Sequence, residues 1–495
     1  MKKRLFSGVI AALLIFALTP AHAVAVDGFL IEDGVLTLYT GTGGTVTIPN
    51  GVKTIGYAAF EGNTALTEIV IPDSVTAIEY SAFSRCTALK SVTLPGNLTT
   101  IGSYAFEGCT SLAYANIPEN VEIIYADAFR GCSAMKQFTV HEQNKAYTSE
   151  NGILYDKNKT VLLYYPAKKA GSSFAVPNSV LSIGEYAFEE SKNLKSVTLG
   201  TGVREIRSYA FAGCGLTSIS LGKGVTDIVF APFYNCKSLE EIVVDPQNPL
   251  YSSENGVLYH NGINEAIKTT LFAYPAGKKD AAFKVPDNVK IIDAFAFYGN
   301  SYLMALTIEK NVTMTTSIDA CSALILYGRA GSSVEVYAKE YSIPFIAGKA
   351  PPAESLVLKA LPTSSTVLVN GRPVSIDAYS INQSNYFKLR DLARVLSGTS
   401  AQFDVVWDSE NNAIRLTGSE AYSVAGSELT GTDGGVKIPV PNTSKIILDH
   451  FPMDLSGYII DGNNYFKLRE IAALFYFTLE WDGLNNAILI NTGDL

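Results

Sequence analysis

Histidine and tryptophan are scarce in this chain. The sequence holds four histidines and two tryptophans among 495 residues. Beyond the first 23 residues only His141, His260 and His450 remain, and they are far apart in the sequence. A copper site needs clustered imidazoles. The spacing therefore predicts no metal site and no metal cofactor.

The motifs that carry hydrolytic or phosphoryl chemistry are missing as well. The chain has no His-Glu-x-x-His, no Gly-x-Ser-x-Gly and no Gly-Lys-Ser/Thr loop. His141-Glu142 lacks the second histidine of a zinc motif, and Asp408 with Glu410 lacks the alternating ligands of a calcium loop. We therefore predict that the protein is not an enzyme and has no catalytic, cofactor-binding or metal-binding residues.

Positive charge is in short supply. Lys and Arg number 38 against 47 Asp and Glu, and removing a leader of residues 1–23 takes away three cations. An acidic chain without basic blocks argues against nucleic acid and against anionic membrane surfaces as partners. A hydrophobic content of 47% excludes wholesale disorder.

Long apolar runs are confined to the N-terminus. Lys2, Lys3 and Arg4 precede an apolar run over 5–18 and an Ala-x-Ala sequence that ends at residue 23. This order is typical of a cleaved signal peptide. No later segment has the length of a bilayer span, and the chain has neither a lipobox cysteine nor a C-terminal sorting signal. We predict a secreted or cell-envelope-associated protein whose mature chain has no transmembrane segment.

A 23-residue repeat dominates the sequence that follows. An Ala-Phe pair recurs without a slip, ending at Phe60, Phe83, Phe106 and Phe129. Each pair predicts a single helical turn, and the following Leu-x-x-Val-x-Leu-Pro stretch predicts a short strand that proline closes. A fixed period of this length indicates a solenoid. One coil buries too little apolar surface to be stable alone, so its stability must come from stacking.

The six cysteines follow the same period. Cys86, Cys109, Cys132, Cys214 and Cys236 each lie three residues after a repeat phenylalanine, and Cys321 fits a degenerate last copy. Other copies place asparagine or serine in this position. Parallel side chains on neighbouring coils are further apart than a disulfide prefers. We therefore expect unpaired, buried thiols.

Two inserts, near 141–178 and 245–287, interrupt the repeats. Each contains an Asn-Gly pair between short apolar segments, Asn151-Gly152 and Asn255-Gly256, which predicts a tight hairpin followed by another strand. Tyrosines make the inserts a second candidate surface, although we expect many of them to pack inward. They are Tyr147, Tyr155, Tyr164, Tyr165, Tyr251, Tyr259 and Tyr274.

The chain is expected to divide into a cap over 24–51, a solenoid over 52–347, a linker over 348–356 and a final domain over 357–495. The final domain is itself duplicated, because residues 385–393 recur as 464–472 and Trp407-Asp408 recurs as Trp481-Asp482. Each half predicts a short helix with one apolar face and a hairpin. The predicted fold class is a mainly β solenoid followed by a small duplicated α+β domain.

The repeat pattern Ile-x-x-x-Ala-Phe-x-x-Cys-x-x-Leu-x-x-Val-x-Leu-Pro resembles the BspA-like leucine-rich repeats of bacterial surface and secreted proteins. The resemblance implies a right-handed solenoid with strands on one wall, used in adhesion to host proteins or other cells.

The Asn-Tyr-Phe-Lys-Leu-Arg motif of residues 357–495 resembles the copper amine oxidase N-terminal-like domain of exported Gram-positive proteins. The oxidase's copper and its tyrosine-derived cofactor belong to a catalytic domain with no counterpart here. Tyr386 and Tyr465 lie in Asn-Tyr-Phe, whereas the cofactor tyrosine is expected in Asn-Tyr-Asp/Glu.

The outward positions of the repeat strand form the candidate binding face. They are rich in hydroxyl and amide groups, and Tyr114 is the aromatic anchor among them, a residue type enriched in binding hot spots. The alternative is a merely solvated sheet face. The candidate residues are Ser91, Thr93, Tyr114, Asn116, Gln137, Thr139, Ser196, Thr198, Ser218 and Ser220.

We favour a non-catalytic binding protein, in which the solenoid mediates protein–protein interaction or adhesion and the C-terminal domain serves as stalk or wall-proximal module. Its partner would be a host matrix protein, another cell-surface protein or cell-wall glycan. The alternative is a structural envelope component that holds glycan or partner proteins without a specific host ligand.

Overall fold

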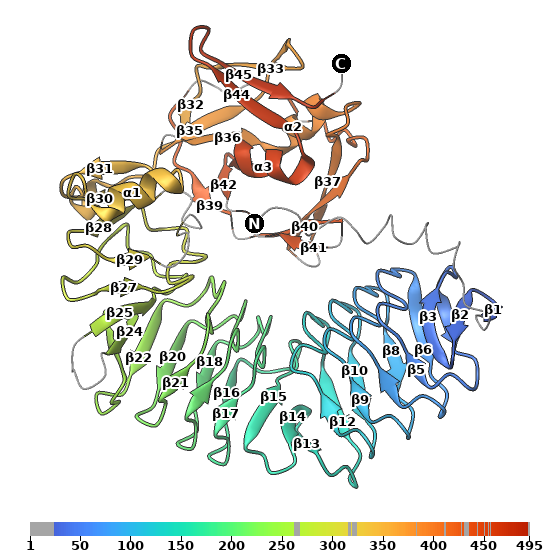
Figure 1. Ribbon diagram of the computed structural model, residues 1–495. Helices are drawn as coiled ribbons and strands as arrows, with labels where there is room; N and C mark the ends of the chain where they lie inside the picture. The colour runs from blue at the N-terminus through green and yellow to red at the C-terminus, as the bar shows by residue number, and fades with distance from the viewer. Residues whose placement is uncertain are drawn as a thin grey trace. The chain divides into compact units, whose positions relative to one another are not determined.

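A computed structural model describes the protein over residues 24–261, 268–314, 318, 324–382, 384–409, 412–426, 428–429, 435–442, 444–449, 451–453, 455 and 457–493 (Figure 1). The predicted signal peptide, Glu410, Cys321 and His450 lie outside the described residues. The chain forms two compact units, Met1–Gly215 with Gly224–Phe233 and Leu216–Lys223 with Tyr234–Leu495. Within the described ranges, none of the helices combines the length and apolar character that a bilayer span requires.

The fold class is confirmed. A β-solenoid of about 13 turns with a period near 23 residues precedes a separate, β-rich C-terminal region with short helices. The domain boundaries remain predictions.

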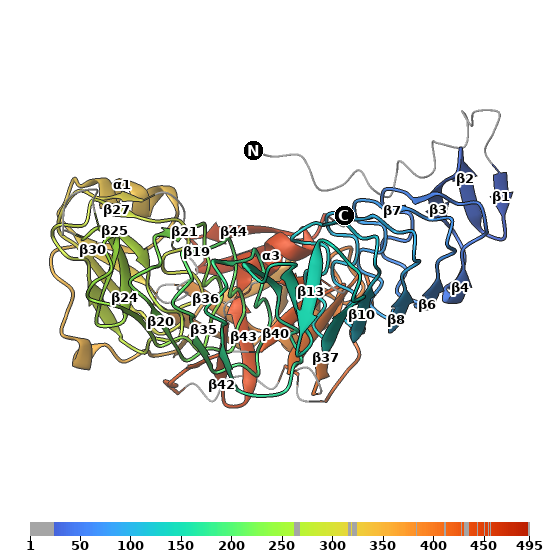
Figure 2. The same cartoon turned by 90° about the horizontal axis from the view of Figure 1, so that it is seen from below.

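Each coil of the first unit contributes a strand to each of two walls, which Figure 2 shows with β4, β6, β8 and β10 along one side and β3 and β7 along the other. The first wall is a sheet in the order β1 (Val24–Val26), β2 (Phe29–Glu32), β3 (Val35–Tyr39), β5 (Thr54–Ile55), β7 (Ala77–Ile78), β9 (Thr100–Ile101) and β11 (Ile123–Ile124). The second holds β4 (Gly44–Thr47), β6 (Leu66–Val70) and β8 (Ser91–Thr93) in one sheet and β10 (Tyr114–Ile117) with β12 (Gln137–Val140) in another.

The repeat phenylalanines form a continuous stack between these walls. The ring centroids of Phe60 and Phe83 lie 4.9 Å apart, and the next two steps, to Phe106 and Phe129, measure 5.3 Å each. The Phe60 N–H donates to the Ala82 carbonyl of the next coil at 2.8 Å, and the two following phenylalanines make the same bond. Stacked rings attract each other beyond the gain from burial alone. Each coil is thus held by its neighbours.

Five cysteines, Cys86, Cys109, Cys132, Cys214 and Cys236, are buried thiols and form no disulfide, which confirms the prediction for them. Cys86 Sγ donates to the Phe60 carbonyl at 3.2 Å, and Cys109 and Cys132 repeat this bond on later coils. Burial raises the pKa of the Cys86 thiol to about 12. The thiol is therefore a small core group that also satisfies a backbone carbonyl of the preceding coil.

The first insert is a modified coil. β13 (Tyr147–Glu150) and β14 (Ile153–Asp156) form the predicted hairpin, whose turn residues Asn151 and Gly152 have φ of 51° and 81°. Tyr165 then takes the place of the repeat phenylalanine, because its N–H donates to the Ala187 carbonyl at 2.7 Å and its ring lies 5.1 Å from that of Phe188. The first stack ends at Phe129, which meets Tyr164 edge-on at 5.7 Å, and a second stack starts at Tyr165. The strands that follow are β15 (Val161–Tyr164), β16 (Ser173–Ala175), β17 (Ser182–Ile183), β18 (Ser196–Thr198), β19 (Glu205–Ile206) and β21 (Asp227–Ile228).

The second unit repeats this design. Tyr274 occupies the phenylalanine position of the second insert, with its N–H donating to the Ala296 carbonyl at 2.7 Å. A short helix, α1 (Ser333–Glu340), lies near the end of the repeats. The strands are β20 (Ser218–Leu221), β22 (Glu241–Val244), β23 (Tyr251–Glu254), β24 (Val257–Asn261), β25 (Lys268–Ala273), β26 (Ala282–Lys284), β27 (Ile291–Ile292), β28 (Ala305–Ile308), β29 (Thr313–Met314), β30 (Ile325–Gly328) and β31 (Phe345–Ala347). A 3₁₀ turn, η3, follows at Ala353–Ser355.

The C-terminal region has a central six-stranded sheet, in the order β32 (Leu361–Pro362), β35 (Ala378–Ile381), β36 (Ser384–Lys388), β43 (Asn463–Lys467), β42 (Gly457–Ile460) and β39 (Val440–Pro441). Both predicted helices are present, α2 (Leu389–Leu396) and α3 (Leu468–Phe475), and each buries its apolar face.

Two further sheets interlock the two halves of this region. One joins β34 (Arg372–Val374) and β33 (Thr366–Val369) to β45 (Ala487–Asn491) and β44 (Thr478–Asp482); the other joins β37 (Phe403–Asp408) and β38 (Ala413–Gly418) to β40 (Lys445–Leu448) and β41 (Phe451–Met453). The predicted hairpins β37–β38 and β44–β45 therefore each pair with strands of the opposite half.

Candidate binding surfaces

The predicted strand face is open to solvent. Nine of its ten residues are exposed and Ser218 is half-buried. Parallel pairing aligns Tyr114 with Gln137 and Asn116 with Thr139. Eight of the ten residues belong to the first unit, whereas Ser218 and Ser220 lie in the second, where they pair with Glu241 and Val243.

Tyr114 is the most prominent group on this face. Its side chain is 56% exposed, and Lys136 Nζ lies 6.0 Å from the ring centroid. Beside it, Thr139 Oγ1 donates to Asn116 Oδ1 at 3.0 Å, which fixes two polar side chains of neighbouring coils in one orientation. The result is an exposed aromatic ring flanked by ordered hydroxyl and amide groups.

The first insert interrupts the face after β12. The Phe138 N–H donates to the Gly152 carbonyl at 2.9 Å, and the Val140 N–H donates to Ser149 Oγ at 3.2 Å. A Cβ on Gly152 would lie 3.1 Å from Gln137 Cγ, so the hairpin turn packs closely against this strand. Ser196 and Thr198 consequently pair with Ser173 and Ala175 of β16 instead of β12.

The insert tyrosines are largely core residues. Six of the seven are buried and Tyr147 is partly exposed, in line with the expectation that many pack inward. Tyr147 OH accepts the Ile124 N–H at 2.8 Å, and Tyr164 OH donates to the Ala126 carbonyl at 2.8 Å. These hydroxyls satisfy backbone groups of the preceding coil and present little surface to a partner.

A row of aromatic residues lies on the loops before the repeat phenylalanines, with Tyr57 and Tyr80 exposed and Tyr104 half-buried. Tyr57 and Tyr80 are 67% and 45% exposed, with their rings stacked at 5.5 Å, and Tyr104 meets Tyr80 edge-on at 5.4 Å. Sequence reasoning missed this row because its members lie two or three residues before the phenylalanine, in no fixed position. A search of successive repeats for aromatic residues two or three positions before the phenylalanine would have revealed this row.

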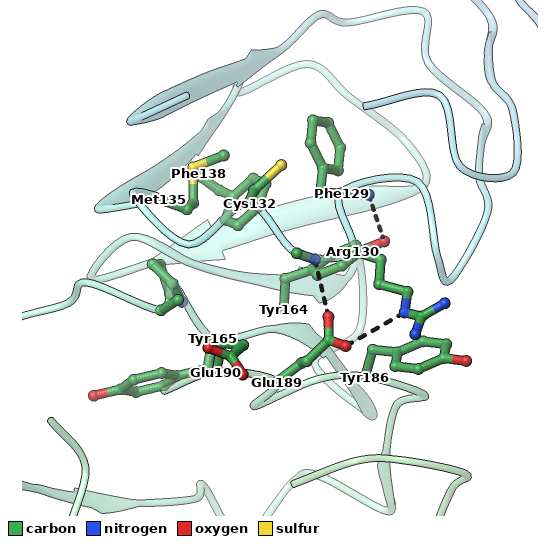
Figure 3. Close-up of a pocket in the computed structure, with 13 residues that line it drawn as sticks. Phe129, Arg130, Cys132, Met135, Phe138, Tyr164, Tyr165, Tyr186, Glu189 and Glu190 are labelled. Atoms are coloured by element: carbon green, nitrogen blue, oxygen red, sulfur yellow. Dashed lines mark hydrogen bonds and ion pairs between the residues drawn. The ribbon is translucent and has the colours of Figure 1, made fainter. Parts of the chain in front are cut away.

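A small pocket lies where the first insert meets the repeats (Figure 3). Arg130 Nε lies 3.3 Å from Glu189 Oε1, and the Gly131 N–H donates to Glu189 Oε2 at 2.9 Å. Burial raises the pKa of Glu189, and Arg130 opposes that shift. The free space measures about 20 Å³, room for one water molecule. This site therefore joins two coils across the insert and leaves no space for a substrate.

Comparisons with known proteins agree with the repeat pattern. The family described as BspA type leucine rich repeat region matches in six copies, over residues 39–152, 165–272 and 265–320, more than half of the chain. The match does not reach the C-terminal region. No curated protein matches the chain.

Several solved structures are similar. A leucine-rich repeat protein from Eubacterium ventriosum is 24% identical, with a TM-score of 0.43; the matched region covers 60% of this chain and 78% of that protein. A leucine rich cell surface protein from Faecalibacterium prausnitzii is 20% identical, with a TM-score of 0.36, covering 67% and 100%. The pneumococcal vaccine antigen PcpA is 18% identical, with a TM-score of 0.34, covering 66% and 96%.

Proposed function

This chain belongs to the BspA type leucine rich repeat family, and we propose that it is a secreted or cell-envelope-associated, non-catalytic binding protein whose solenoid holds another protein. Stacked repeats present a long surface on which neighbouring coils contribute side chains side by side. The N-terminal 23 residues, with their cationic start and apolar run, support export.

The observation that carries the proposal is the exposed strand face around Tyr114. A half-exposed tyrosine beside Lys136 and the Thr139–Asn116 pair offers one amphipathic ring and several oriented hydrogen-bonding groups. Tyrosine is enriched in the residues that dominate protein–protein binding energy. Extracellular-matrix or cell-surface proteins are the partners that this face fits best. Nucleic acid does not fit as a partner, because the chain carries a net negative charge.

For residues 357–495 we propose a copper amine oxidase N-terminal-like domain that acts as stalk or wall-proximal module. The support is the duplicated Asn-Tyr-Phe-Lys-Leu-Arg motif, which in both halves ends a strand and opens a helix, β36–α2 and β43–α3. No copper chemistry is part of the proposal, and the boundaries 24–51, 52–347 and 348–356 for cap, solenoid and linker are proposed with it.

The direct test is binding of the mature chain, residues 24–495, to immobilised matrix proteins, to whole cells and to purified cell-wall sacculi. The proposal predicts saturable binding to a protein or to protease-sensitive sites on cells. Binding to sacculi alone, unaffected by protease treatment of the target, would contradict it and support the alternative of a structural component that holds glycan.

A further inference from the structure

A second pocket lies within the C-terminal region. It measures about 340 Å³, within the range of pockets that bind small molecules. Residues from both halves line it: Lys388 and Arg390 at the start of α2, Trp407 and Ile414 on β37 and β38, and Asn463 and Asn464 on β43. The pocket thus depends on the interlocked arrangement of the halves.

One wall of this pocket is an apolar platform. Trp407 is 45% exposed, although it pairs with the buried Ile414 across the β37–β38 hairpin. Val405, on the same strand, and Ile414 complete the wall with 6% and 2% exposure. A flat, half-exposed indole over buried aliphatic groups is suited to pack against a flat apolar face of a ligand.

The opposite rim carries polar groups with spare hydrogen-bonding capacity. Asn464 Oδ1 accepts from Asn442 Nδ2 at 2.9 Å, and Asn463 Nδ2 donates to the Asp461 carbonyl at 3.2 Å. Among the described residues, the amide nitrogen of Asn464, the amide oxygen of Asn463 and the hydroxyl of Ser444 have no further protein partner. Together they offer a donor, an acceptor and a group that is both.

Charge around the pocket is compensated within the protein. Lys388 Nζ lies 3.5 Å from Asp391 Oδ1 and 3.7 Å from Asp377 Oδ2, and its side chain is 3% exposed. Arg390 interacts with the Tyr422 hydroxyl, which itself donates to Glu428 Oε1. Because two carboxylates compensate the charge of Lys388, and the hydroxyl beside Arg390 is bonded to Glu428, the pocket favours a neutral ligand over an anion.

In the other copy of the duplication, the equivalent serine is hydrogen-bonded within the protein. Ser365 stands where the other half has Ser444, and its Oγ lies 3.4 Å from Asn486 Oδ1, while Asn486 Nδ2 donates to the Ser364 carbonyl at 3.1 Å. Trp481, the counterpart of Trp407, is 58% exposed and does not line the pocket. The equivalent serines of the two copies therefore differ in hydrogen bonding, and only one of the two tryptophans lines the pocket.

We propose that this pocket binds a neutral saccharide unit. A sugar ring presents an apolar C–H face, which matches Trp407, and a periphery of hydroxyls, each a donor and an acceptor, which matches Ser444, Asn463 and Asn464. The inference concerns a different surface from the solenoid face, so it does not depend on the protein-binding function proposed above.

The test is calorimetric titration of the full mature chain with chitotetraose, cellotetraose and maltotetraose, with trigalacturonate and inorganic phosphate as charged probes. We expect saturable binding of at least one neutral oligosaccharide. Trp407→Ala should weaken it at least about tenfold, and Ser444→Ala should weaken it about fivefold. Trp481→Ala is the matched control and should bind as the unaltered chain does.

Circular dichroism and thermal unfolding verify that each variant is folded, and Tyr114→Ala separates this site from the solenoid, since it should leave saccharide binding unchanged. The chain has two tryptophans, so in a Trp481→Phe background the fluorescence of Trp407 reports the same site when the pocket is filled. No neutral saccharide bound at millimolar concentration, binding of charged probes alone, or equal loss in Trp481→Ala would each overturn the proposal.

Discussion

The position three residues after each repeat phenylalanine links neighbouring coils by hydrogen bonds. In successive coils, Cys86, Cys109 and Cys132 each donate to a phenylalanine carbonyl of the preceding coil. Asn300 fills the same position with 0% exposure and donates to the Pro275 and Lys278 carbonyls at 3.0 and 2.8 Å. Cysteine and asparagine thus bond to backbone carbonyls from the same position, whereas the hydroxyl of Ser191, buried in the same position, has no partner among the described residues, so the position favours a small buried side chain without requiring a donor.

Burial should keep these thiols unreactive in the folded protein. The pKa of Cys86 is raised to about 12 and that of Cys109 is raised well above its ordinary value, so both are protonated at pH 8. In a Cys321→Ser background we expect no alkylation by iodoacetamide under native conditions and modification of five thiols in guanidinium. Mass spectrometry gives the count. Rapid alkylation of the native protein would contradict the assignment of buried, free thiols. So would two cysteines that react only after a reductant is added.

At the same scale, the Arg130–Glu189 pair spans the first insert. The Glu189 side chain is only 16% exposed beside Arg130, and removing the guanidinium would leave the carboxylate without its main counter-charge. We expect Arg130→Ala to lower the free energy of unfolding by about 2–3 kcal/mol at pH 7, measured by chemical denaturation.

The pH dependence of that loss has a definite sign. Burial already raises the folded pKa of Glu189, and losing Arg130 raises it further. A carboxyl group with a raised folded pKa stabilises the protein when protonated, and that contribution is lost as pH rises through the folded pKa. The deficit of Arg130→Ala should therefore shrink as pH falls below the folded pKa of Glu189. Adding Glu189→Gln to the Arg130→Ala variant should recover stability at pH 7. A double variant with the same loss of unfolding free energy as Arg130→Ala alone would refute this account.

At the scale of elements, the halves of the C-terminal region cannot fold separately. β38 pairs in parallel with β40, and β33 pairs in parallel with β45, so each hairpin lies beside a strand from the other half. We predict that a chain ending at residue 435 leaves residues 357–435 unfolded, because its sheets lose these partners and expose apolar edges.

Limited proteolysis measures this directly. In the truncated chain we expect rapid cleavage throughout 357–435 while the repeats stay intact, whereas the full chain should resist cleavage in both regions. Protease resistance of 357–435 in the truncated chain would show that the first half is an independent domain.

Much of the fold could be predicted from sequence because the repeat is local. The spacing of the Ala-Phe pairs, the Asn-Gly turns at 151–152 and 255–256 and the apolar faces of α2 and α3 all depend on residues close together in the chain. The exchange of hairpins between the halves could not be predicted, because pairing of β38 with β40 is a long-range contact that no local pattern records.

The candidate site was only partly predictable for the same reason. The outward positions near Tyr114 follow from strand alternation. The interruption after β12 depends on where the Gly152 turn packs, and the exposed row at Tyr57 and Tyr80 depends on loop geometry. The C-terminal pocket needs both halves in place, so neither half of the sequence indicates it alone.

For the whole molecule, the central claim is that the strand face at Tyr114 holds a protein partner. The most direct measurement compares the affinity of Tyr114→Ala and Tyr125→Ala for the partner found with the full mature chain. These tyrosines are 56% and 52% exposed in the same unit, but Tyr125 lies outside the strand face. We predict that Tyr114→Ala weakens binding about thirtyfold, as expected for a hot spot, while Tyr125→Ala has no effect. Equal affinity of both variants and the unaltered chain would contradict the claim.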